Sequence, residues 1–180
     1  MNDEQMEHLV HSSGADILRF CRITTGNRED GDELYQDTML TLLEKLDSLD
    51  EGQNVKSYAI SVAIRLWKGR RRKLARRLRL VPQESLDALT EQGGHPIQGS
   101  GSPEEGLLHQ TQVELVRELV AQLPEQYRLP IQMYYSAGLP ACAIAEVLKL
   151  PENTVKSRLH RARKIIRTQL EEMEYERSGI

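Results

Sequence analysis

The sequence predicts an all-α protein in which two small helical domains are joined by a flexible linker. Three observations support this: apolar residues recur at three- and four-residue steps, good helix formers are abundant, and one central segment is rich in Gly, Pro and Ser. Of the 180 residues, 39% are hydrophobic and only 4% aromatic, which suits modest helical cores. We place the N-terminal domain at residues 1–81, the linker at 82–106 and the C-terminal domain at 107–180.

The N-terminal domain is predicted to consist of three helices. Periodic apolar residues indicate the first two, namely Met6, Leu9/Val10, Ile17 and Cys21, then Leu34/Tyr35, Met39, Leu42/Leu43 and Leu46. Asn27 is a suitable N-cap for the second helix, with Asp30 and Asp32 near its positive end. The third helix runs from Val55 to about Leu80. Residues 58–64 are also compatible with a strand, but the Pro-free basic continuation favours a helix.

The C-terminal domain is predicted to consist of four helices. The pattern resumes at Pro103–Glu105, and the stripes of its first two helices are Leu108, Leu115/Val116, Leu119 and Leu123, then Tyr127, Ile131 and Tyr134/Tyr135. Pro124 suits the first turn of the second helix, which Pro130 should bend or shorten and which should stop near Gly138. A short helix then begins near Pro140, and a longer one follows Pro151.

The net charge is only −3, but the charged side chains are distributed unevenly. Residues 1–51 contain thirteen acidic and four basic side chains, whereas residues 52–83 contain ten basic side chains and no acidic one. Residues 149–167 contain seven basic side chains and a single acid, Glu152. This asymmetry indicates that different segments have different partners, at least one of them polyanionic.

The segment PENTVKSRLHRARKII, residues 151–166, combines a narrow apolar stripe with a cationic face. On a helix the stripe contains Val155, Leu159, Ala162 and Ile166, and the opposite face contains Asn153, Lys156, Ser157, His160, Lys164 and Arg167. Arg161 and Arg163 lie on the flanks, and Arg158 lies nearer the buried side, where it could pair with Glu146. A short helix and a tight turn precede this helix, so the pair predicts a helix-turn-helix that reads the major groove. A solvated charged face is the alternative.

The segment RLWKGRRRKLARRLRL has nine basic side chains between Arg65 and Arg79, a density that favours binding to phosphates. Tyr58 and Trp67 could stack on unpaired bases, or they could be core residues of a small domain. Upstream, Asp32, Glu33 and Asp37 share one predicted helix, which suits a basic protein surface; an ordinary solvated acidic helix is the alternative.

Catalytic motifs are missing, because the sequence contains no phosphate-binding Gly-rich loop, HExxH motif or nucleophile elbow. We therefore expect that the protein is not an enzyme, needs no cofactor and binds no small-molecule substrate. His8 and His11 could share a helix face, but two histidines alone rarely bind a metal, and no metal site is predicted.

The two cysteines, Cys21 and Cys142, are far apart and in no paired motif, which favours buried or partly buried thiols in a reducing compartment. The polar, acidic N-terminus is unlike a signal peptide, and no apolar run approaches the ~20 residues that span a bilayer. These features predict a cytoplasmic protein that does not insert into membranes.

The segment LPEQYRLPIQMYYSAGLPACAIAEVLKLPENTVKSRLHRARKII resembles the −35-binding region of bacterial sigma factors, particularly the extracytoplasmic-function (ECF) group of the sigma-70 family. TVKSRLHRAR is its most specific run. In the N-terminal half, GNREDGDELYQDTMLTLLEKLDSLD resembles the polymerase-docking helix of that family, and VKSYAISVAIRLWKGRRRKLARR resembles the segment that handles the −10 element. The resemblance covers about residues 5–80 and 107–170.

The resemblance implies a transcription initiation factor that binds core RNA polymerase and directs it to promoters, recognising the −35 duplex and helping to melt the −10 region. The implied −35 contacts are Asn153, Thr154, Lys156, Ser157, His160, Arg161 and Lys164. The implied −10 contacts are Tyr58, Arg65, Trp67, Lys68, Arg70, Arg71, Arg72 and Lys73. The implied polymerase contacts are Asp32, Glu33, Gln36 and Asp37. An anti-sigma factor is a further candidate partner.

Four positions depart from the family pattern. Lys149 stands where the family usually has Gly, so a left-handed backbone there would be strained. Tyr58, Arg65 and Gly69 stand where the family usually has Trp, Asn and Asp, which affects readout of the −10 element. Two other functions fit the same residues: a stand-alone helix-turn-helix regulator that binds DNA without polymerase, and an adaptor that binds polymerase but not DNA.

Overall fold

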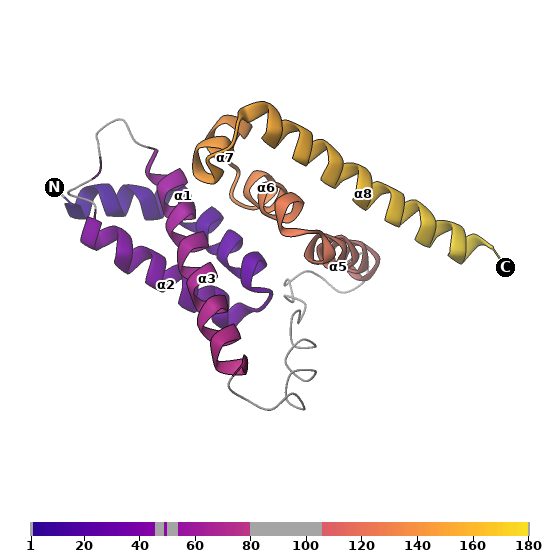
Figure 1. Ribbon diagram of the computed structural model, residues 1–180, viewed down its shortest axis with the longest axis horizontal. Coiled ribbons are helices and arrows are strands. Elements are labelled where there is room, and N and C mark those ends of the chain that lie inside the picture. Colours follow the sequence, from indigo (N-terminus) through magenta and orange to yellow (C-terminus); the bar gives the residue numbers. More distant parts are fainter. Residues whose placement is uncertain (1, 46–48, 50–53, 80–105, 180) are drawn as a thin grey trace.

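The computed structural model describes residues 2–45, 49, 54–79 and 106–179. Over these residues every regular element is an α-helix, in the order α1, α2, α3, α5, α6, α7 and α8 (Figure 1). The prediction of an all-α fold is therefore confirmed. The predicted linker, residues 82–106, lies outside the described residues except for Gly106, which begins α5.

The N-terminal half is a bundle of three helices, α1 (Asn2–Thr25), α2 (Arg28–Lys45) and α3 (Val55–Arg79). Their shared core contains fully buried Ile17, Phe20, Leu34, Leu42 and Ile60. The third segment is a helix, as predicted, and the strand alternative for residues 58–64 is wrong. Two residues of the predicted stripes, Val10 and Leu43, are instead exposed. Leu46 lies outside the described residues.

The turn between α1 and α2 confirms the predicted cap. The side-chain Oδ1 of Asn27 accepts a hydrogen bond from the backbone N–H of Asp30 at 2.8 Å, which satisfies one of the unpaired donors at the start of α2. Asn54 caps α3 in the same way, because its Oδ1 accepts from the N–H of Ser57 at 3.1 Å.

The α1–α2 contact depends on a glycine. A Cβ atom added at Gly31 would lie 2.5 Å from the Cα of Arg22 and 2.9 Å from its backbone nitrogen. Backbone atoms cannot rotate away as a side chain can, so a methyl group there would push the two helices apart. Gly31 thus permits the close approach on which this part of the core depends.

We expect Gly31→Ala to lower the free energy of unfolding by about 1–3 kcal/mol, the usual cost of overpacking. The measurement is urea unfolding followed by circular dichroism. Gly69→Ala is the matched control, because a Cβ at helical Gly69 meets nothing within 4 Å. That control should raise stability by about 0.5–1 kcal/mol through helix propensity alone. Equal effects at the two positions would contradict the close approach at Gly31.

The C-terminal half contains α5 (Gly106–Gln122), α6 (Glu125–Tyr135), α7 (Ala141–Leu148) and α8 (Glu152–Ser178). Leu119, Leu123, Ile131, Met133 and Ile144 are buried in it. Helix α6 runs without a break through buried Pro130, so its start is not shortened. Its predicted stripe is wrong at its end, where Tyr134 and Tyr135 are 39% and 60% exposed. The predicted stripe of α5 is likewise wrong at Val116, which is 39% exposed, and the side chain of Leu108 is not among those described.

Helices α7 and α8 form the predicted helix-turn-helix, with Lys149 between them. Lys149 has φ 54° and ψ 48°, and it is the only non-glycine residue with positive φ in the described part of the chain. Its N–H caps α7 by donating to the carbonyls of Ala145 and Glu146. The backbone at Lys149 is thus left-handed, the conformation expected to be strained for a residue other than Gly, at a cost of about 1–2 kcal/mol.

The two halves pack against each other. Helix α3 contacts α7, and α1 contacts α6, while α8 extends away from the N-terminal bundle toward the C-terminus (Figure 1). Both cysteines are unpaired. Cys21 is fully buried, and desolvation raises the pKa of its thiol to about 12. Cys142 is exposed, which corrects the expectation that both thiols are at least partly buried.

Candidate nucleic-acid and polymerase interfaces

The first half of α8 presents a polar face to solvent. Val155, Leu159 and Ala162 are buried at 0%, 3% and 0% exposure, and Ile166 packs against the same core. The predicted −35 contacts lie on the other side: Asn153, Lys156, Ser157, His160, Arg161 and Lys164 are exposed, and Thr154 is half-buried. The predicted orientation of the helix is confirmed. The ion pair suggested for Arg158 and Glu146 does not occur among the described residues, although Arg158 is half-buried.

The hydrogen bonds that Lys156 and Ser157 make within α8 leave both side chains on its exposed face. Lys156 pairs with Glu152 one turn earlier, Nζ to Oε1 2.7 Å, and this hydrogen bond raises the pKa of the lysine. Ser157 Oγ donates to the carbonyl of Asn153 at 2.9 Å. Both bonds are exposed and within one helix, so they can exchange for DNA contacts at little cost.

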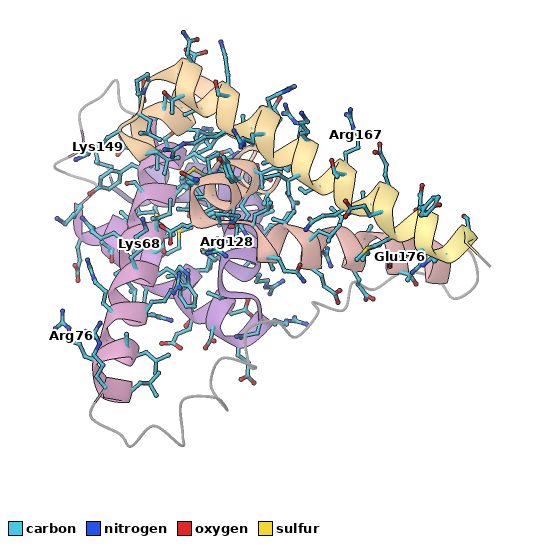
Figure 2. The ribbon with its side chains drawn as sticks, turned by 45° about the vertical axis from the view of Figure 1, so that its right-hand side comes forward. Lys68, Arg76, Arg128, Lys149, Arg167 and Glu176 are labelled. Atoms are coloured by element: carbon cyan, nitrogen blue, oxygen red, sulfur yellow. The ribbon has the colours of Figure 1, made fainter. Side chains whose placement is uncertain are left out.

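The basic face of α3 divides into two parts. Arg65, Arg72 and Lys73 are exposed, and the far end of the helix, marked by Arg76, projects away from the rest of the molecule (Figure 2). The aromatic candidates, Tyr58 and Trp67, are half-buried and pack against the core, which fits the core interpretation at least as well as stacking on bases. Lys68, Arg70 and Arg71 are held by acids from other helices.

The predicted polymerase contacts on α2 are partly engaged within the molecule. Arg70 pairs with Asp37 and with Glu33, the latter at 3.1 Å between Nη2 and Oε1. Asp32 pairs with Arg22, Nε to Oδ1 2.6 Å, and this bond lowers the pKa of the carboxyl group. Glu33 remains 63% exposed at its side chain despite its partner, and Gln36 is exposed. Two predicted sites, the α2 acids and the α3 bases, therefore meet at Arg70.

One acid of the C-terminal half reaches the basic face of α3. Glu125, at the start of α6, pairs with Lys68 (Oε1 to Nζ 2.9 Å) and Arg71 (Oε2 to Nη1 3.7 Å). The hydrogen bond from Lys68 lowers the pKa of Glu125 below its ordinary 4.5, with smaller contributions from Arg71 and Arg128. Figure 2 shows Lys68 on the side of α3 that faces α6. Sequence reasoning missed Glu125, because nothing in the local pattern connects it to α3.

A groove of about 470 Å³ lies between α5, α6 and α8, with Ile23 of α1 at its edge. Its walls are mainly apolar, and its rim carries the cations Arg117, Arg163 and Arg167. The buried Oε1 of Gln132, on the same wall, has no hydrogen-bond partner in the described structure. The groove therefore has mainly apolar walls and one hydrogen-bond acceptor, Gln132 Oε1, that has no partner in the described structure.

The exposed tyrosines of α6 fix the rim of this groove. Arg163 donates from Nε to the hydroxyl of Tyr135 at 2.9 Å. Its guanidinium carbon lies 5.4 Å and 5.6 Å from the ring centres of Tyr134 and Tyr135, within cation–π range. Arg163 is therefore committed to α6 and not to the −35 face.

In the part of the chain that the structure describes, no group of three or more His, Cys, Asp or Glu side chains could hold a metal ion. The helices over the same residues do not combine the length and apolarity needed to cross a membrane.

Comparison with known families matches both halves. Residues 9–77 match the family Sigma-70 region 2, and residues 114–166 match Sigma-70, region 4. The chain is 27% identical over 165 residues to the ECF RNA polymerase sigma factor SigW of Bacillus subtilis, covering 87% of this chain and 84% of SigW. It is also 27% identical over 169 residues to the ECF sigma factor SigL of Mycobacterium tuberculosis, covering 93% and 90% of the two chains.

Solved structures show the same fold. The sigma factor RpoE of Bartonella quintana, in complex with the anti-sigma factor NepR, superposes with a TM-score of 0.75 over 95% of this chain and 98% of RpoE, at 19% identity. CnrH, in complex with the cytosolic domain of CnrY, superposes with a TM-score of 0.64 over 94% of this chain and 89% of CnrH, at 18% identity. With region 2 and region 4 both present, the chain belongs to the ECF group of the sigma-70 family, whose members direct RNA polymerase to promoters.

Proposed function

We propose that this sigma factor divides its work between two domains, residues 1–81 for polymerase docking and the −10 element, and residues 107–180 for the −35 element. The single observation that carries the −35 assignment is the orientation of α8, whose apolar stripe is buried while the donors at Lys156, Ser157 and Arg161 face solvent. Arg and Lys at the start of a docked helix can meet guanine edges and phosphates in the major groove.

At the −10 element, α3 binds the displaced strand mainly through phosphates. Its cations Arg65, Lys68, Arg71, Arg72 and Lys73 line one helix, which supplies affinity but little sequence information. Tyr58 and Trp67 are half-buried, so each presents only part of its ring to a base. Strand separation then comes from binding that favours unpaired strands over the closed duplex.

Core polymerase binds α2 through exposed Glu33 and Gln36 together with half-buried Asp37. The groove of the C-terminal half adds a second polymerase contact. Its apolar walls, cationic rim and unused Gln132 acceptor suit an amphipathic helix with acidic flanks.

A protein that works with core polymerase and promoter DNA acts in the cytoplasm. An anti-sigma factor is a further partner, supported by the fold shared with RpoE, which was solved with the anti-sigma factor NepR.

Run-off transcription tests this proposal. Core polymerase, with and without the full chain, is given a library of promoters, and the initiated sequences are recovered. We expect initiation at a defined −35 and −10 pair only when the protein is present. Tight operator binding without polymerase would instead indicate a stand-alone regulator. Polymerase binding with no promoter selection would indicate an adaptor.

A further inference from the structure

Arg70 joins two sites that the sequence predicts to have different partners. It belongs to α3, among cations predicted to bind the −10 strand, but its side chain is only 27% exposed. Its nitrogen Nη2 reaches α2, where it pairs with Oε1 of Glu33 at 3.1 Å and donates to Oδ2 of Asp37. One guanidinium nitrogen therefore bridges two acids of the helix proposed to dock on polymerase.

Burial distinguishes Arg70 from other cations of α3. Arg65, Arg72 and Lys73 are exposed, whereas Arg70 is half-buried. Desolvation raises the pKa of the Cys21 thiol to about 12, and the positive charge of Arg70 partly opposes this rise, so the guanidinium lies near the core of the bundle. With its charge placed between the core and two carboxylates, Arg70 contributes little to a surface that binds phosphates.

The bridge changes how the two acids of α2 are presented. Glu33 and Asp37 stand one helical turn apart, so their charges repel each other unless a cation lies between them. Arg70 offsets this repulsion and restricts both side chains. Each contact uses one carboxylate oxygen, while the side chains of Glu33 and Asp37 remain 63% and 44% exposed. The second oxygen of each group is therefore accessible to a basic partner, beside exposed Gln36.

We propose that Arg70 is a positioning residue for polymerase docking, which holds Glu33 and Asp37 so that their outer oxygens meet a basic surface of core polymerase. This role rests on the proposed assignment of α2 to polymerase docking. Side chains that are ordered before binding lose less conformational freedom in the complex, and affinity gained at a formed interface appears mainly as slower dissociation. The charge of Arg70 has the opposite effect on association, because it weakens the attraction of a basic partner.

Replacing Arg70 by alanine in the full chain should therefore speed both rate constants, but to different extents. Association with core polymerase should be at most about twofold faster, because the acids are no longer partly neutralised. Dissociation should be about 5- to 20-fold faster, because two side chains must now be ordered on binding. Surface plasmon resonance with immobilised core polymerase, without promoter DNA, measures both rates.

Arg76→Ala is the matched control for charge. Arg76 is an exposed cation near the far end of the same helix, where α3 projects away from the rest of the molecule (Figure 2). The substitution removes the same charge and should leave the dissociation rate unchanged. Equal acceleration of dissociation by Arg70→Ala and Arg76→Ala would overturn the positioning role, because net charge alone would then explain the effect.

A second background separates positioning from a defect in folding. In a chain that carries Glu33→Gln and Asp37→Asn, Arg70 no longer has these two carboxylates to hold, so Arg70→Ala should not speed dissociation further. A folding defect would act in both backgrounds, and thermal unfolding of each variant measures it. Equal acceleration by Arg70→Ala in the two backgrounds would contradict the proposal.

Two further outcomes decide between the role of Arg70 and the docking function on which it rests. If neutralising Glu33 and Asp37 leaves binding to core polymerase unchanged, the proposed docking function of α2 fails and the role of Arg70 fails with it. If the neutralised acids weaken binding but Arg70→Ala leaves dissociation unchanged or slows it, only the positioning role is wrong. Slower dissociation would mean that Arg70 competes with polymerase for the two acids.

Discussion

Replacing Arg161 by alanine should weaken promoter binding by the holoenzyme by about 1–3 kcal/mol, or roughly 5- to 150-fold. Arg161 is exposed on α8 beside buried Ala162, so its loss leaves no cavity and no unpaired partner in the described structure. The loss should be confined to one −35 base pair, where every replacement base then binds almost equally well. The measurement is competition binding with promoters varied singly at each −35 position.

Arg177→Ala provides the control, because Arg177 is exposed on the same helix near its C-terminus, far from the proposed −35 face. It should leave both affinity and base preference unchanged. A uniform loss across all promoters with Arg161→Ala would reassign Arg161 to a phosphate contact. In that case the salt dependence of binding should also become less steep, by about one unit of slope.

Much of the fold could be predicted because local rules decide it. The steps between Val155, Leu159 and Ala162 define a buried stripe, and the structure buries all three. Asn27 caps α2 because an Asn side chain can accept from the third N–H of a helix. The left-handed turn at Lys149 follows from the need to end α7 and begin α8 within a few residues.

The errors arise where periodicity cannot tell which neighbour a helix meets. Tyr134 and Tyr135 continue an apolar stripe, but both rings stay exposed at this end of α6, where they contact Arg163. Cys142 lies one residue before buried Ala143 and turns outward. On a short helix, neighbouring residues point in different directions, so one can be buried and the next exposed. Composition alone does not predict which of the two is buried.

The pairing of Glu125 with Lys68 and Arg71 could not be predicted, for a different reason. It joins residues more than fifty positions apart and depends on how two separately formed halves meet. Likewise, Glu33, Asp37 and Arg70 were assigned to different partners from their local sequence, yet they form one cluster. The sequence shows which charged side chains could bind a partner, but it does not show that these side chains also pair with one another.

The second large effect is expected at α2, where Glu33→Lys should weaken binding to core polymerase about tenfold. Glu33 is 63% exposed, and reversing its charge removes an attraction to a basic partner and adds a repulsion. The change also places a cation beside Arg70, so folding must be checked by thermal unfolding. Gln36→Lys is a second variant that breaks no ion pair, because Gln36 is an uncharged, exposed residue on the same helix.

Both substitutions should act mainly on the rate of association. Charges at the edge of an interface steer the encounter, and their effect on the association rate falls as salt screens them over about 8–10 Å. Stopped-flow binding at low and high salt measures this directly. Glu44→Lys, an exposed reversal at the other end of α2, controls for net charge and should have a clearly smaller effect. If all three variants slow association equally, the acidic helix acts through its total charge and Glu33 is not a specific contact.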